Sequence, residues 1–192
     1  MKQYYNLPAS LPYLDYDSEN FLSVSEFFEQ CQPWLDVRDL SIIDGLANAG
    51  NIDEYVRRAE QVIPEFAEYE RGLRTALASA RASKLNREYI PNPSVSTGGE
   101  IERDCSEALN QPDPLLREQF LDRRRWAKLD DLAVGHFFDI RFLAVYGFKL
   151  LLLQRKKSFS RQQGVDRFTA AYNSIWAEIE NHVPKSESGA IL

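Results

Sequence analysis

Apolar side chains recur every three or four residues along most of this sequence, a spacing that limits the chain to helices burying one face each. The stripe over residues 52–85 keeps its phase across Pro64, which predicts one long helix kinked at that proline. Residues 140–154 are apolar on nearly every side, as expected of the central helix of a bundle. A closing amphipathic helix over 165–183 is expected to pack on it. The predicted fold class is all-α, a helical bundle that the long helix could elongate.

Local signals indicate where other helices begin. Ser23 and Glu26 have the spacing of a capping box, which predicts a short helix directly after them. Asp36 can cap the next short helix, and Asp139 can cap the central one. By contrast, the strip 4–12 holds two prolines in five positions, so we expect an extended N-terminal arm there.

The length of 192 residues suits a single all-helical domain. Residues 89–99 mix proline, serine and glycine without periodicity, which is typical of a flexible connection. The alternative organisation is therefore two lobes, 1–88 and 100–192, joined by this loop.

The helix predicted to begin near residue 115 carries charges on its apolar face. That face collects apolar side chains such as Leu121 and Trp126. At 100° per residue, Glu118, Asp122 and Arg125 point into the same sector. Burying an unpaired charge is strongly unfavourable. We therefore expect either a charge network within the fold or a partner surface that completes one.

Basic residues cluster at two places in the second half of the chain. Arg123, Arg124 and Arg125 are consecutive, but a helix disperses them around its axis, and the formal charge of −6 argues against a nucleic-acid partner. The basic run 155–157 follows the central helix, where cations interact favourably with the helix dipole. We interpret this run as a solvated helix end.

Sequence patterns of catalysis and ligand binding are missing. The chain has no glycine-rich phosphate loop, and His136 and His182 cannot be combined with Cys31 or Cys105 in a metal-binding spacing. We therefore expect no enzymatic activity, no metal, no cofactor and no small-molecule substrate. Two cysteines without a disulfide framework indicate a reduced, cytoplasmic protein. Charged residues interrupt the most apolar stretch, 137–153, so we expect no direct membrane insertion.

Several short segments resemble a known family, and the two ends of the likeness are more specific than its middle. They are Tyr4-Tyr5-x-Leu7-x-Ala9-Ser10-Leu11-Pro12, Ser25-Glu26-Phe27 with Cys31, Leu121-Asp122-Arg123-x-Arg125-Trp126-x-x-Leu129-Asp130, and His136-x-Phe138-Asp139-Ile140. The family is an uncharacterised helical one, typically encoded among the subunits of bacterial V-type (A-type-like) ATPases. It is distantly similar to the funnel of helical bundles that seats the central shaft of those enzymes on the membrane ring.

This resemblance implies a non-catalytic subunit or assembly adapter that links the central shaft of a V-type ATPase to its membrane ring in ATP-driven ion transport. The shaft and ring subunits would be its partners, and the complex would hold it at the inner membrane as a peripheral protein. We expect Asp122, Arg123, Arg125, Trp126 and Asp130 to form a ridge that holds the helices in register or meets the shaft. The alternative is a helical protein–protein interaction scaffold of an unrelated cytoplasmic complex.

Overall fold

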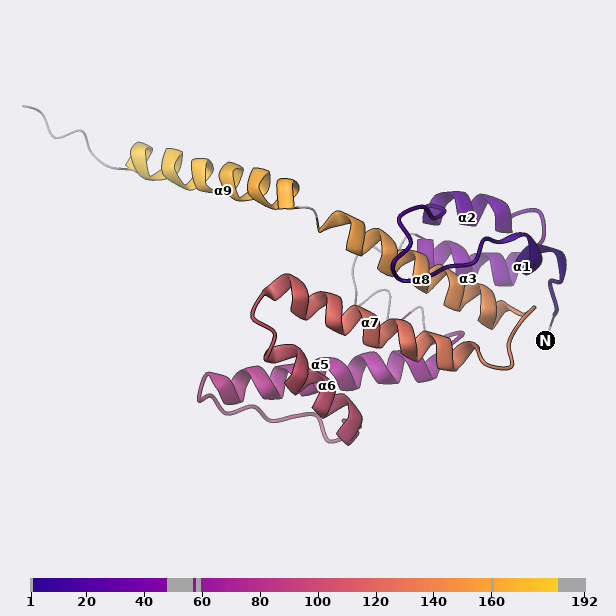
Figure 1. Cartoon of the computed structure of the whole chain (residues 1–192), viewed down its shortest axis with the longest axis horizontal. Coiled ribbons are helices and arrows are strands. Elements are labelled where there is room, and N and C mark those ends of the chain that lie inside the picture. The colour runs from indigo at the N-terminus through magenta and orange to yellow at the C-terminus, as the bar shows by residue number, and fades with distance from the viewer. Residues whose placement is uncertain (1, 48–56, 58–59, 160, 183–192) are drawn as a thin grey trace, which may run out of the picture. The chain divides into compact units, whose positions relative to one another are not determined.

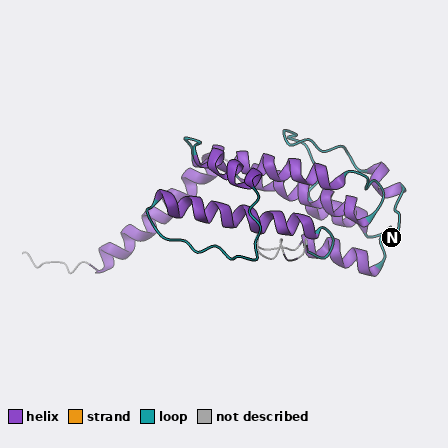
Figure 2. Ribbon diagram, turned by 90° about the horizontal axis from the view of Figure 1, so that it is seen from below, coloured by secondary structure: helices purple, strands orange, loops and turns teal. Residues whose placement is uncertain are grey.

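The computed structural model describes residues 2–47, 57, 60–159 and 161–182 (Figure 1). Within these residues the chain forms helices and no strand, as Figure 2 also shows. The helices are α1 Asn6–Ser10, α2 Val24–Cys31, α3 Val37–Ala47, α5 Pro64–Lys84, α6 Gly99–Leu109, α7 Pro114–Ala133, α8 Ile140–Ser158 and α9 Arg161–His182. The all-α fold class predicted from the apolar spacing is confirmed. None of the helices in the described ranges is both long and apolar enough to cross a bilayer.

The chain divides into two compact units, Met1–Lys156 and Lys157–Leu192. The first unit contains every helix from α1 to α7 and nearly all of α8, whereas α9 belongs to the second. The boundary between units therefore lies at the end of α8 and not in the segment 89–99. Helices on both sides of that segment pack together, because α5 contacts α6 and α7 (Figure 1).

Two apolar clusters hold the first unit together. The larger one joins the N-terminal helices to α5, α7 and α8, and its centre is aromatic: the ring centroids of Phe66 and Phe148 lie 5.2 Å apart, as do those of Phe27 and Tyr146. The smaller cluster lies between α5, α6 and α7. Most residues of α8 between Ile140 and Leu153 are buried, as predicted for the central helix of the bundle.

The helix starts predicted from capping residues are confirmed. The Ser23 hydroxyl accepts a hydrogen bond from the Glu26 N–H at 3.1 Å, and the Glu26 carboxylate accepts one from the Ser23 N–H at 2.7 Å. Asp36 accepts from the N–H of Asp39 at the start of α3. Asp139 accepts from the N–H of Phe142 at 3.0 Å and so caps α8. Each carboxylate or hydroxyl satisfies a donor that has no partner within its helix.

The extended arm predicted for residues 4–12 is wrong in its centre, where the chain forms the short helix α1. Pro8 is the third residue of this helix. The N–H groups of a first turn have no acceptor within the helix, so a proline there removes no hydrogen bond. The helix ends at Leu11, whose ψ of 136° is the extended conformation expected before Pro12. Leu7 anchors α1 in the core with 1% of its surface exposed.

The long helix predicted over 52–85 differs from the described structure at Pro64. Helix α5 begins at Pro64, and the preceding Ile63 has φ −133° and ψ 68°, which is not helical. A proline in the first helical position loses nothing, whereas a proline inside a helix removes a hydrogen bond and clashes with the preceding turn. Residues 48–56 and 58–59, on which the rest of that prediction falls, lie outside the described ranges.

Candidate functional site

A buried arginine on α7 ties this helix to α5. The Nε of Arg125 donates to Oε1 of Glu70 at 2.6 Å, and its Nη1 donates to Oδ1 of Asp122 at 2.9 Å. The side chains of Glu70 and Asp122 are each 1% exposed and that of Arg125 is 7% exposed. Three charged groups are therefore removed from water, and each has an opposite charge within hydrogen-bond distance.

A second arginine extends this network to α8. Arg155 donates from Nη1 to Oδ1 of Asp122 at 2.7 Å and from Nη2 to Oε2 of Glu118 at 2.5 Å. Asp122 thus lies between two guanidinium groups, one from its own helix and one from α8. Three carboxylates and two guanidinium groups join α5, α7 and α8, and we call these five residues the ion network.

Burial and pairing act on the ion network in opposite directions. Burial alone would lower the pKa of Arg125, but the carboxylates of Glu70 and Asp122 outweigh it and raise that pKa, so the guanidinium stays charged. Burial raises the pKa of Asp122, and Arg125 and Arg155 oppose this rise. Removing one partner would leave a buried charge uncompensated, which is the costly way to break such a network.

The ion network corresponds to one of the two alternatives drawn from the sequence. Charges on the apolar face of α7 pair within the fold, and Asp122 and Arg125 are both members. The sequence did not point to Glu70 or Arg155 as their partners. Glu70 could have been noticed, because it lies between Phe66 and Leu73 on the apolar stripe of α5. Arg155 was assigned to a solvated helix end, whereas its side chain is 29% exposed and pairs with two carboxylates.

Arg123, the third predicted ridge residue, contacts the loop before α2. Its Nη2 donates to Oδ1 of Asp17 at 2.9 Å, and its guanidinium carbon lies 4.6 Å from the centroid of the Tyr16 ring. Lys156 approaches the same two residues, with Nζ 3.0 Å from Asp17 Oδ1 and 4.4 Å from the Tyr16 centroid. Two cations therefore share one ring and one carboxylate at this surface.

Trp126 and Asp130 complete the predicted set. The Trp126 ring meets the Tyr16 ring edge-on with centroids 5.6 Å apart, and Lys149 Nζ lies 4.9 Å from the Trp126 centroid. Lys149 also donates to the carboxylate of Asp130. All five predicted residues thus contact other elements of the first unit, Asp122, Arg125 and Trp126 from buried positions.

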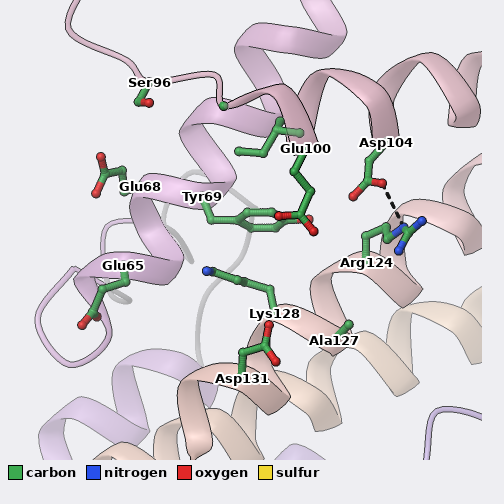
Figure 3. A pocket seen from close by; sticks show the side chains of 12 residues that line it. Glu65, Glu68, Tyr69, Ser96, Glu100, Asp104, Arg124, Ala127, Lys128 and Asp131 are labelled. Carbon is green, nitrogen blue, oxygen red and sulfur yellow. Dashed lines mark ion pairs between the residues drawn. The ribbon is translucent and has the colours of Figure 1, made fainter.

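A groove lies among α5, α6 and α7 and has a volume of about 370 Å³ (Figure 3). Its lining is acidic, with five carboxylates against two cations. The carboxylates are Glu65, Glu68, Glu100, Asp104 and Asp131, and the cations are Arg124 and Lys128. A surplus of three negative charges in a concave surface favours a positively charged occupant.

The floor of this acidic groove is partly aromatic. Figure 3 shows Tyr69 between the labelled side chains of α6 and α7, and Lys128 Nζ lies 6.0 Å from its ring centroid. Arg124 is engaged by Asp104, with Nε 3.2 Å from Oδ1. Burial raises the pKa of Asp104, and Arg124 opposes the rise. One of the two cations in the groove is therefore already paired.

The rim of the groove is closed where the chain passes over Gly72 of α5. A Cβ atom built on Gly72 would lie 2.6 Å from the carbonyl oxygen of Ser96 and 3.2 Å from Cδ1 of Ile101. Only a glycine allows the backbone to approach the helix this closely. The segment expected to be a flexible connection therefore rests on α5 at Ser96.

Comparisons with protein-family models, with curated proteins and with solved structures give no match to this chain. The arrangement of its own side chains is therefore what bears on function.

Other chemistry-bearing side chains of the first unit serve the fold. His136 Nδ1 lies 2.6 Å from Oδ2 of Asp139 at the turn before α8. Burial raises the pKa of the Cys31 thiol to about 12 and that of the Cys105 thiol to about 11. Among the residues described, no three or more His, Cys, Asp and Glu side chains are grouped to hold a metal ion.

Proposed function

We propose that this chain is a non-catalytic helical adapter whose acidic groove receives a basic segment of a partner protein. The observation that carries the proposal is the groove itself, with its surplus of three negative charges and the ring of Tyr69 in its lining. Lysine and arginine side chains suit such a surface, because carboxylates attract them and an aromatic face interacts favourably with a cation. The ion network behind the groove keeps α5 and α7, two of its walls, in fixed register.

The finer proposal is that the partner complex is a V-type ATPase. It is supported by the resemblance of residues 4–12 and 121–140 to the family encoded among bacterial V-type ATPase subunits. In this role the chain links the central shaft to the membrane ring, or acts in their assembly, at the cytoplasmic side of the inner membrane. A protein of the shaft or of the ring would then supply the basic segment.

An unrelated cytoplasmic complex is the second candidate. A helical bundle with a charged groove serves equally well as a protein–protein interaction scaffold, since a fold does not specify its partner. The two candidates differ in which proteins bind the chain.

The test is a mild affinity purification of the tagged chain from its native membranes, followed by mass spectrometry. We expect the catalytic and shaft subunits of the ATPase in a fixed ratio. The double variant Glu68→Lys with Asp131→Lys reverses two exposed groove charges and should reduce recovery of the partners at least tenfold. The matched control is Glu19→Lys with Glu29→Lys, which changes the net charge equally at exposed positions outside the groove.

Three outcomes distinguish the proposals. Loss of the ATPase subunits in the groove variant alone supports both the adapter role and the groove. Recovery of other proteins without ATPase subunits favours the scaffold. Equal recovery from the groove variant and its control contradicts the role of the groove.

A further inference from the structure

Helix α9 presents an uncovered apolar face. Six large apolar side chains along it are between 45% and 72% exposed: Val165, Phe168, Tyr172, Ile175, Trp176 and Ile179. Within the unit Lys157–Leu192, α9 is the one helix that the structure describes in full, so no second helix of that unit covers these side chains. A contiguous apolar face of this size marks an interaction surface, and an isolated helix of 22 residues is only marginally stable in water.

The spacing on this face is that of a coiled coil. Val165, Phe168, Tyr172, Ile175 and Ile179 are separated by alternating steps of three and four residues, so they occupy successive a and d positions of a heptad. This 3.5-residue repeat keeps one narrow seam facing a single partner helix, whereas packing into a globular core follows a wider stripe. The rings of Phe168, Tyr172 and Trp176 also contact in sequence along the helix, with centroids 6.3 Å and 6.1 Å apart.

Helix α8, on which the closing helix was expected to pack, has little apolar surface left to accept it. Its side chains Leu143, Phe148 and Leu150 are fully buried, and Leu152 and Leu153 are at most 5% exposed. They belong to the larger core of the first unit together with residues of α1, α2, α3, α5 and α7. The apolar seam of α9 therefore needs a different cover.

The charges of α9 favour a second copy of itself in the opposite direction. Residues 161–171 carry Arg161, Arg167 and Asp166, a net charge of +1, and residues 172–182 carry Glu178 and Glu180, a net charge of −2. Antiparallel pairing places the positive half of each helix against the negative half of the other. Parallel pairing places like-charged halves together, which is unfavourable.

We propose that the α9 helices of two copies of this chain pair as an antiparallel two-stranded coiled coil. In the register that alternates a and d layers, Phe168 packs against Ile179 of the second copy, and Tyr172 packs against Ile175 of the second copy. The pairing is independent of the acidic groove and of the proposed adapter function. It makes the chain a homodimer.

The first test measures the mass of the full-length chain by light scattering after size exclusion over a range of concentrations. We expect twice the chain mass of 22.1 kDa at high concentration. Phe168→Glu places a charge in the seam and should weaken the dimer about a hundredfold, since a buried unpaired charge is strongly unfavourable. Ala170→Glu adds the same charge at an exposed position away from the seam and should leave the mass unchanged.

The second test determines the orientation and does not depend on whether a variant still folds α9 alone. Under mild oxidation, an equimolar mixture of the Phe168→Cys and Ile179→Cys chains should form a disulfide-linked dimer of the two. Neither variant by itself should link. The native thiols of Cys31 and Cys105 are buried and stay out of the reaction.

The result that overturns the proposal is clear in both tests. A wild-type chain that stays monomeric at every concentration shows that its own first unit or another protein covers the seam. Linking of Phe168→Cys with itself, without linking in the mixture, shows a parallel pair. A dimer that Phe168→Glu leaves as stable as Ala170→Glu does forms through another surface.

Discussion

The Nε of Arg125 on α7 and Oε1 of Glu70 on α5 lie 2.6 Å apart in the interior, although 55 residues separate them in the sequence. Neither side chain is more than 7% exposed. Such a contact stabilises one relative placement of two helices, because any slip along either axis would leave both charges buried and unpaired. The walls of the acidic groove depend on that placement, since α5 and α7 both contribute to its lining.

Truncating Arg125 should therefore destabilise the protein strongly. We expect Arg125→Met to reduce the free energy of unfolding by about 3–5 kcal/mol, because Glu70 and Asp122 would remain buried with one guanidinium fewer. Urea unfolding followed by circular dichroism measures this. The double variant Arg125→Met with Glu70→Met removes both charges and should recover part of the loss.

The neighbouring arginine is the matched control for this measurement. Arg123→Met removes a side chain that is 56% exposed and paired with Asp17 at the surface. The expected loss is about 1 kcal/mol or less, as for other surface ion pairs. Equal losses at Arg123 and Arg125 would show that the ion network does not hold the helices in register.

Helix starts could be predicted from the sequence because their signals are local. Ser23 and Asp139 satisfy donors within three residues of themselves, so spacing alone locates them. The partners of Asp122 could not be found in this way. Helical phase shows that a charge points into the core, but it does not show which helix meets it, and Arg155 comes from 33 residues away.

Pro64 illustrates a second limit of helical phase. The apolar stripe has the same phase before and after Pro64, so spacing could not distinguish a kinked helix from a helix that begins there. Proline is compatible with both, because it is tolerated at a first turn and bends a helix elsewhere. The groove was missed for a related reason, since its carboxylates come from three helices whose packing no local pattern specifies.

Gly72→Ala should displace the chain from the rim of the groove. The added methyl group would lie 2.6 Å from the Ser96 carbonyl oxygen, which is backbone and cannot rotate away. We expect a net destabilisation of about 1–2 kcal/mol, since overpacking outweighs the better helix propensity of alanine. Hydrogen exchange at Ser96 and its neighbours should rise, and urea unfolding gives the energy.

Gly99→Ala provides the comparison for Gly72→Ala. A Cβ atom on Gly99 would meet nothing within 4 Å, and the residue begins α6. This variant should be neutral or more stable by up to about 1 kcal/mol, because alanine restricts the unfolded chain. If Gly72→Ala behaves in the same way, the contact at Ser96 does not constrain the loop.

The two cysteines should react slowly with thiol reagents while the protein is folded. Burial raises the pKa of Cys31 to about 12 and that of Cys105 to about 11, and the thiolate is the reactive form. At pH 8 we expect labelling to be on the order of a thousandfold slower than in denaturant, where the pKa is near its ordinary value. Timed labelling with mass spectrometry of the peptides separates the two sites. Rapid labelling of Cys31 in the native protein would show that α2 opens readily.

Stability should fall on acidification through Asp139. Burial would raise the pKa of this carboxyl, but its hydrogen bonds with the His136 ring and with the N–H of Phe142 outweigh burial and hold the pKa below its ordinary value. Its ordinary pKa is about 3.9. The unfolded chain therefore binds a proton at a higher pH than the folded protein does, so this contribution is complete above about pH 5 and is lost as the pH falls through the folded pKa.

Asp139→Asn tests this pH dependence, because asparagine can still accept the hydrogen bond that caps α8 but does not titrate. We expect urea unfolding between pH 6 and pH 3 to show a shallower loss of stability in the variant than in the wild type. Asp15→Asn is the matched control, since Asp15 is an exposed aspartate outside α8. An equal slope in the wild type and Asp139→Asn would mean that Asp139 does not couple α8 to protonation.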